Sequence, residues 1–220
     1  MIVLADVLTD DELARVREGL ARAPFRDGKA TAGPVARRVK DNEQARGDDP
    51  EVQALARLVR EALERHPVFA ALARPARWSN LMFSRYSGGQ QYGFHTDDAA
   101  MRDERGDPLR TDLSVTLFLA DTADYDGGAL LIDGLDGERE FRPAAGSAVL
   151  YQTGQMHCVT PVTRGERLAC VGWIQSQVRR ADRRELLFDL ERLRPAVPEG
   201  EARLLLDKSI GGLLRMWSET

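Results

Sequence analysis

An imidazole and a carboxylate stand two residues apart at His95 and Asp97, in a segment rich in glycine and aromatic residues. Side chains two apart on an extended chain project from the same face, so this pair can chelate one metal ion. One more histidine would complete the 2-His-1-carboxylate triad that holds Fe(II) in non-haem oxygenases. The search for that ligand is short, because the chain contains three histidines.

His157 is the histidine whose position suits the third ligand. It follows a predicted strand, and the chain between His95 and His157 is long enough for three or four further strands. A turn or strand end can direct its imidazole back over a neighbouring strand. His66 ends a predicted helix just before Pro67 and is expected to be exposed, without a ligand role. For each histidine taken alone, an ordinary hydrogen-bonded imidazole is the alternative interpretation.

Arg167 strengthens the prediction of a catalytic site around the triad. It opens another predicted strand. A guanidinium is always charged and binds a carboxylate through two parallel hydrogen bonds. At the mouth of the last strand it could bind the distal carboxylate of a dicarboxylic cosubstrate that the metal chelates. The alternative for Arg167 by itself is a solvated hairpin residue paired with Glu166 or with nothing.

The spacing of apolar residues changes along the chain and predicts the helices and strands that would position these residues. Helical spacing predicts one helix after Thr9, which forms a capping box with Glu12, and a second helix after Asp49. Residues 78–174 contain several short segments of period two separated by turns, which predicts an all-β sandwich or jelly roll. The segments include a strand from Trp78 to Tyr86 and a clean alternation from Leu113 to Leu119, and residues 159–165 are expected to form a connection with a turn. Residues 27–49 lack apolar periodicity and are expected to form a long loop or an irregular strand.

Helical spacing returns near the C-terminus in two apolar segments, at 181–193 and 201–217. We therefore expect a jelly-roll domain with N-terminal helices at 1–177 and a small helical extension at 178–220. The apolar stripe of this extension could serve as a surface for homo-oligomer formation.

Composition excludes several classes of protein. The formal net charge is −4, from 31 basic and 35 acidic residues that are interspersed, so no nucleic-acid or membrane-binding patch is expected. The first residues lack the basic region of a secretory signal, and no apolar run approaches the roughly 18 residues of a membrane helix. Cys158 and Cys170 are expected to be buried free thiols in a reducing compartment, which predicts a cytoplasmic protein.

Six short phrases accompany the candidate ligands. They are Arg-Tyr-Ser-Gly-Gly (85–89), Tyr-Gly-Phe-His-Thr-Asp (92–97), Arg-Thr-Asp-Leu-Ser (110–114), Asp-Tyr-Asp-Gly-Gly (124–128), Val-Thr-Pro-Val-Thr-Arg-Gly (159–165) and Arg-Arg-Glu-Leu-Leu-Phe-Asp-Leu (183–190). With the triad and Arg167, they make the chain resemble the bacterial PKHD-type hydroxylases. These belong to the Fe(II)/2-oxoglutarate dioxygenase superfamily and are relatives of prolyl 4-hydroxylases. The resemblance covers nearly the whole chain.

The resemblance implies roles by position. The implied iron ligands are His95, Asp97 and His157. Arg167 matches the partner of the 2-oxoglutarate carboxylate, and Tyr86 stands where relatives direct a tyrosine hydroxyl at the same carboxylate, although Tyr92 is also near. The implied fold is a double-stranded β-helix with flanking helices. Ascorbate as a reductant and a link to iron uptake are implied by the family alone.

The implied reaction is hydroxylation of an unidentified substrate, a small molecule or a peptide, by O2. In that reaction 2-oxoglutarate is decarboxylated to succinate and CO2. The alternative function is a non-catalytic metal-binding or iron-sensing module on the same jelly roll, because a fold does not dictate a function. The presence of both Asp97 and Arg167 favours the enzyme, since a pure metal binder needs no carboxylate clamp.

Overall fold

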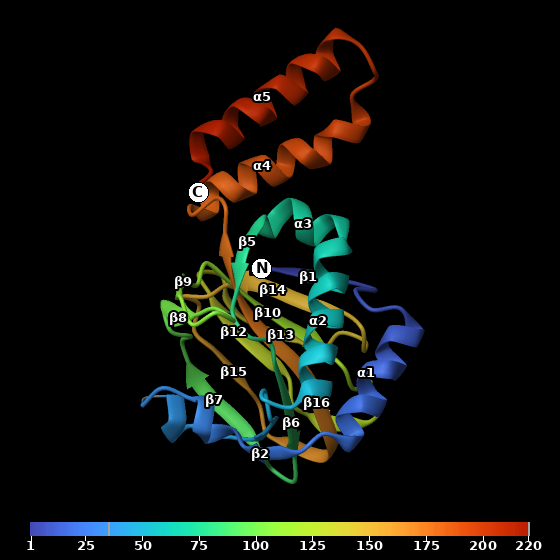
Figure 1. Ribbon diagram of the computed structural model, residues 1–220, viewed down its shortest axis with the longest axis vertical. Helices are drawn as coiled ribbons and strands as arrows, with labels where there is room; N and C mark the ends of the chain where they lie inside the picture. The colour runs from blue at the N-terminus through green and yellow to red at the C-terminus, as the bar shows by residue number, and fades with distance from the viewer. Residues whose placement is uncertain (35, 220) are drawn as a thin grey trace.

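The computed structural model describes residues 1–34 and 36–219. Two antiparallel β-sheets lie face to face in the body of the molecule, helices cover the outer face of the larger sheet, and a helical hairpin projects from one end (Figure 1). This is the mainly β jelly roll with flanking helices and a helical appendage that the sequence predicts. The helices are α1 (Asp10–Arg22), α2 (Pro50–Arg65), α3 (Pro67–Ala73), α4 (Ala181–Leu193) and α5 (Glu201–Trp217).

The larger sheet has seven strands in one path and two that pair beside it. In order these are β1 (Ile2–Leu4), β14 (Ala148–Gln152), β10 (Leu113–Phe118), β16 (Val162–Ser176), β6 (Met82–Ser87), β4 (Glu43–Ala45) and β2 (Phe25–Asp27), with β11 (Tyr125–Gly127) and β5 (Pro75–Trp78) also paired to β16. Its long strand β16 joins β10 to β6 at the centre of the sheet.

The smaller sheet carries the histidines that the sequence singles out. Its order is β13 (Gly137–Phe141), β12 (Leu130–Gly134), β15 (His157–Val159), β7 (Gln91–His95) and β3 (Lys40–Asp41). A separate pair is β8 (Ala100–Arg102) with β9 (Pro108–Arg110), and the short 3-10 turns are η1 (Gly28–Thr31), η2 (Ala36–Arg38) and η3 (Arg194–Ala196).

The main apolar core lies between the larger sheet and helices α1 and α2. The Thr9–Glu12 capping box and the Asp49 cap start these helices as predicted. Val16 and Val59 are fully buried against the sheet, where Leu117 is also fully buried. Each such side chain contributes about 1.5–3 kcal/mol through removal of apolar surface from water. The opposite face of the same sheet is more polar and faces the smaller sheet.

Two expectations about the strands need correction, and the segment left open as a loop or an irregular strand contains short strands. The connection expected at 159–165 is mostly strand, because β16 begins at Val162 and its residue Gly165 pairs with Tyr125 of β11. The single strand expected from Trp78 to Tyr86 is divided into β5 and β6. Residues 27–49 contain two short strands, β3 and β4, that hydropathy did not reveal.

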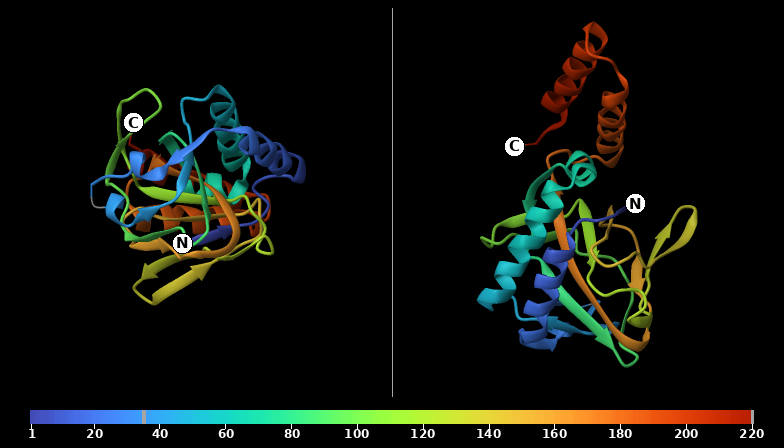
Figure 2. Two further views of the ribbon diagram at one scale, coloured as in Figure 1. Left: turned by 90° about the horizontal axis from the view of Figure 1, so that it is seen from below. Right: turned by 90° about the vertical axis from the view of Figure 1, so that its right-hand side faces the viewer.

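Helices α4 and α5 form an antiparallel hairpin that stands away from the sheets (Figure 2). Its own small core contains Leu187 and Ile210, and Gly211 and Gly212 do not interrupt α5. Val178 belongs to this core as well, directly after the boundary that we place at residue 177. That division of the chain remains a prediction. Among the described residues, no helix is long and apolar enough to cross a membrane.

Candidate metal centre

His95, Asp97 and His157 converge in a cavity between the two sheets. His95 is the last residue of β7 and His157 the first residue of β15, and the two are direct partners in the ladder that joins these strands. Asp97 follows two residues after the end of β7. One potential ligand atom of each side chain lies within 4.8 Å of the others. The sheet register therefore assembles the three groups that the sequence predicts as ligands.

Both imidazoles are held in the orientation that a metal ligand needs. Nδ1 of His95 lies 2.8 Å from the carbonyl oxygen of Gly93, and Nδ1 of His157 lies 3.0 Å from that of Gln155. A carbonyl can only accept a hydrogen bond, so Nδ1 carries the proton in each ring. In the neutral ring Nε2 then keeps a free lone pair, and each Nε2 faces the Asp97 carboxylate, at 3.8 Å from His95 and 3.7 Å from His157.

Asp97 is oriented by a serine on the facing sheet. Ser114 of β10 donates a hydrogen bond of 2.8 Å to Oδ2 of Asp97, and Thr153 Oγ1 lies 3.1 Å from the same serine oxygen. Such support of a ligand by a neighbouring group fixes its direction and strengthens metal binding. Sequence reasoning did not single out Ser114, because one serine on a buried strand carries no signal of its own.

Burial keeps His95 in the form that binds metals. Burial, with the neighbouring His157 as a second cause, lowers the pKa of His95 to about 4, against the effects of the Gly93 carbonyl and of Asp97. The ring of Tyr92 stacks on His95 with centroids 3.6 Å apart. His95 is therefore neutral across the physiological range. Two imidazoles and one carboxylate form a donor set that suits Fe(II).

Arg167 is a buried cation in the same cavity, and its side chain is 1% exposed. It lies within β16 rather than at the start of a strand, opposite Tyr86 of β6. Among the described residues no carboxylate pairs with it, and its Nε and Nη2 have no hydrogen-bond partner. Burial lowers its pKa. The alternative interpretation of Arg167 as a solvated hairpin residue is therefore excluded. A charge buried in this way is stabilised by an anion bound to it.

The space around Arg167 is shaped by a glycine and two aromatic rings. Its guanidinium lies 5.3 Å from the ring centre of Tyr86 and 5.1 Å from that of Phe118. A Cβ on Gly128, whose φ is +62°, would come within 2.9 Å of Arg167 Cδ. Gly128 thus leaves room for the arginine beside the Asp-Tyr-Asp-Gly-Gly turn.

The two tyrosines that the sequence could not separate occupy different parts of the cavity. Tyr86 lies beside the Arg167 guanidinium and is 4% exposed, and burial raises the pKa of its hydroxyl. Tyr92 lies against His95. Tyr86 is therefore the tyrosine placed near an anion held by Arg167.

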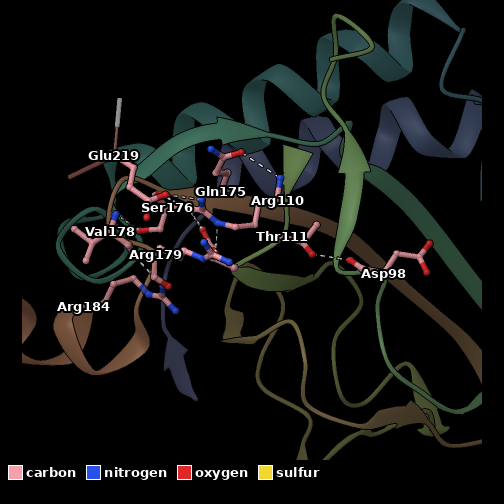
Figure 3. A network of polar contacts seen from close by, with 10 residues as sticks. Asp98, Arg110, Thr111, Gln175, Ser176, Val178, Arg179, Arg184 and Glu219 are labelled. Carbon is pink, nitrogen blue, oxygen red and sulfur yellow. Dashed lines mark hydrogen bonds and ion pairs between the residues drawn. The ribbon is translucent and has the colours of Figure 1, made fainter. Parts of the chain in front are cut away.

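A polar network braces the chain next to Asp97 (Figure 3). The Thr111 hydroxyl donates a 2.6 Å hydrogen bond to the carbonyl of Asp98, and the adjacent Arg110 forms ion pairs with Asp112 and Glu219. Arg110 N–H also donates to the side chain of Gln175 in β16. The residue that follows the acidic ligand is thereby tied to the larger sheet and to the C-terminal segment.

The remaining expectations about the site have mixed outcomes. His66 lies outside the cavity and ends α2 as predicted, but it is half-buried rather than exposed, because its ring accepts from Phe69 N–H and contacts the Ala5 carbonyl. Cys158 and Cys170 are buried and free, as expected. The segments 27–49 and 98–110 both contribute to the cavity wall.

Known proteins share these features. Residues 81–175 match the model of the 2OG-Fe(II) oxygenase superfamily, where 2OG is 2-oxoglutarate. A PKHD-type hydroxylase of Maricaulis maris is 45% identical over 223 residues, which cover 100% of this chain and 99% of the relative. The chain belongs to the PKHD-type hydroxylases. A member from Nitrosomonas europaea is 42% identical over 226 residues and 100% of both chains.

Solved structures of lower identity share the fold of this hydroxylase. A 2OG-Fe(II) oxygenase family oxidoreductase from Burkholderia pseudomallei has a TM-score of 0.58 at 19% identity, over 78% of this chain and 82% of that chain. A Pseudomonas putida prolyl-4-hydroxylase has a TM-score of 0.53 at 22% identity, over 80% and 91%. Family membership makes the protein an oxygenase that uses Fe(II), 2-oxoglutarate and O2. Family membership therefore supports the enzyme over the alternative of a non-catalytic metal-binding module.

Proposed function

We propose that the protein hydroxylates a polar small molecule or peptide at an iron site formed by His95, Asp97 and His157. In this proposal Arg167 binds the distal carboxylate of 2-oxoglutarate, with the Tyr86 hydroxyl beside it. The observation that carries the proposal is a buried arginine without a counter-ion, placed in the same cavity as two imidazoles and a carboxylate. Fe(II) with 2-oxoglutarate supplies oxidation of a C–H bond by O2, with release of succinate and CO2.

The residues of the chain bind and orient the reactants. The carbonyls of Gly93 and Gln155 fix the tautomers of the two histidines, and Ser114 fixes the carboxylate of Asp97. Arg167 can donate from Nε and Nη2 to both oxygens of one carboxylate, because neither group has another partner in the described structure. Such positioning is the main contribution of a protein to chemistry carried by a cofactor.

Several further expectations depend on family resemblance or composition. Ascorbate as a reductant and a role in iron uptake belong to the family resemblance. Cytoplasmic location and self-association through the C-terminal helices come from the sequence. A prolyl hydroxylase from Trichoplax adhaerens was solved with a hypoxia inducible factor peptide, and its TM-score to this chain is 0.57 at 17% identity. A peptide substrate is therefore one of the two classes that we propose, alongside small molecules.

Metal binding and turnover of variants at two of the three histidines test the proposal. His95→Ala should abolish stoichiometric Fe(II) binding under anaerobic conditions and the formation of succinate from 2-oxoglutarate. His66→Ala is the matched control, because His66 lies outside the cavity and should leave both measurements unchanged. A folded, iron-loaded protein that never converts 2-oxoglutarate to succinate, with or without cell extract, would refute the proposal. Mass spectrometry of treated extract for gains of one oxygen atom identifies the substrate.

A further inference from the structure

A short segment between the two sheets lines the cavity with polar side chains. Strand β3 pairs with β7 of the smaller sheet, and β4 pairs with β6 of the larger sheet, so residues 40–45 pass from one sheet to the other. Alternate side chains of this segment are buried and line the cavity, while Asp41 and Glu43 between them point outward. The inward residues are Lys40 at 4%, Asn42 at 2% and Gln44 at 2% exposure.

Lys40 differs from the other lysines of the chain in its burial and in its neighbours. The chain has three lysines, and the other two, Lys29 and Lys208, are exposed. Nζ of Lys40 lies 5.2 Å from the ring centre of Tyr92, the ring that stacks on His95. It donates a 3.1 Å hydrogen bond to the Thr31 hydroxyl, and no carboxylate of the described residues forms an ion pair with it.

Asn42 and Gln44 differ in how far their polar atoms are satisfied. The Gln44 amide is held by Ser84 and by Thr31. By contrast, the Asn42 side chain forms no hydrogen bond of good geometry within the described part of the chain. It lies beside the Tyr86 hydroxyl, and its amide acts to lower the pKa of that group. The segment thus presents one cation, Lys40, and an amide that lies near Tyr86.

The other charged groups of the cavity are Asp97, Asp98 and Arg167. In the proposed function Asp97 binds the metal and Arg167 binds one carboxylate of 2-oxoglutarate, whose other carboxylate is at the metal. The negative charges of Asp97 and Asp27 act on Lys40, while Asp98 lies toward Gly33. A metal ion on Asp97 removes that charge as a counter-ion for Lys40 and adds positive charge nearby. Lys40 is then a buried cation whose remaining negative neighbour is Asp27, with which it forms no ion pair.

We propose that Lys40 binds a carboxylate group of the primary substrate. The inference rests on the proposed function and narrows the substrate to molecules with a carboxylate close to the hydroxylated carbon. Lys40 lies on the Tyr92 and His95 side of the cavity, whereas Arg167 lies beside Tyr86. The two cations can therefore bind carboxylates of different molecules at the same time.

Binding of a small anion to the holoenzyme tests this inference without knowledge of the substrate. The protein is loaded with Mn(II) in place of Fe(II) and saturated with 2-oxoglutarate, so that Arg167 is occupied. Trifluoroacetate and the neutral trifluoroacetamide are then compared by ¹⁹F relaxation, which Mn(II) enhances for molecules bound nearby. Wild-type protein should give a saturable enhancement for trifluoroacetate and little for the amide. Equal enhancement for both probes would overturn the inference.

Variants then assign the effect to Lys40. Lys40→Met should weaken trifluoroacetate binding about tenfold or more, since a charge-assisted hydrogen bond is lost, while Lys40→Arg should retain most of it. Lys29→Met is the matched control and should behave as wild type. Unchanged trifluoroacetate binding in Lys40→Met would show that the anion binds the metal or another group, and would overturn the inference. If Lys40→Met does not fold, Lys40→Gln takes its place.

Binding of 2-oxoglutarate is measured in parallel, so that failure of this inference can be distinguished from failure of the proposed function. Thermal stabilisation by 2-oxoglutarate should be the same in Lys40→Met as in wild type. Loss of that stabilisation in Lys40→Met alone would assign Lys40 to the cosubstrate and overturn the inference. Absence of stabilisation in wild-type protein would instead contradict the proposed function, including the role of Arg167.

Discussion

Replacement of Arg167 by methionine should have opposite effects on the free protein and on cosubstrate binding. Arg167 is 1% exposed, and its Nε and Nη2 have no partner in the described structure. Each unpaired buried donor costs about 1–3 kcal/mol, and replacement of buried charges by apolar groups of similar volume is often neutral or stabilising. Without 2-oxoglutarate, Arg167→Met should therefore be at least as stable as wild type.

Binding of 2-oxoglutarate should be weakened by the same change. Two charge-assisted hydrogen bonds to the distal carboxylate are lost, together worth about 2–3 kcal/mol, which corresponds to a dissociation constant raised about 30- to 150-fold. At a ligand concentration of about 100 times the wild-type dissociation constant, wild type gains about 2.7 kcal/mol of stability. The variant should gain less than about 1 kcal/mol at the same concentration.

Thermal unfolding with and without 2-oxoglutarate measures both effects on one protein. For a domain of this size, 1 kcal/mol corresponds to roughly 2–4 °C in Tm. Arg164→Met is the control, because Arg164 lies on the same strand, is exposed and pairs with Asp126 at 2.6 Å. It should change neither the Tm nor the ligand response appreciably. The reasoning is refuted by an Arg167→Met protein that binds 2-oxoglutarate like wild type, or that is several kcal/mol less stable without it.

Three further predictions concern the metal, the core and pH. Ser114→Ala removes the hydrogen bond to Asp97 and should lower metal affinity about 10- to 100-fold in equilibrium dialysis, with the fold retained. Leu117→Ala, in the fully buried core, should cost about 2–5 kcal/mol in chemical denaturation, whereas Leu204→Ala, at 71% exposure, should cost almost nothing. Burial lowers the pKa of Lys40 to about 8, against Asp97 and Asp27. In the Mn(II)-loaded protein the metal offsets the charge of Asp97, so trifluoroacetate affinity should be lost as the pH rises, at or below about 8, and a pH-independent affinity would contradict this.

The sequence carried most of the information about the larger elements and the ligand set. Clean alternation from Leu113 to Leu119 predicted β10, because one face of that strand packs against helices and the pattern reports burial. His95 and Asp97 could be paired by spacing alone. Their proximity to His157 follows from the register of β7 on β15, which the local sequence does not reveal.

The rest was hidden for identifiable physical reasons. Hydropathy detects apolar alternation, but β3 and β4 bury Lys40, Asn42 and Gln44, so the segment looks like a loop. Strand β16 extends over fifteen residues because β11 pairs with its first part, and Gly165 within it is read locally as a turn. Burial of Arg167 follows from tertiary packing on Tyr86 and Phe118, and no neighbouring residue in the sequence indicates it.

The crossing segment at residues 40–45 also has a consequence for redesign. It belongs to the smaller sheet through β3 and to the larger sheet through β4, and to none of the strands β7, β15 and β16 that carry the histidines or Arg167. Substitutions at positions 40 and 44 would therefore alter what the cavity accepts while the metal ligands and Arg167 stay in place. A small library at these two positions is a direct route to hydroxylases of altered selectivity, screened through oxygen consumption that depends on the added compound.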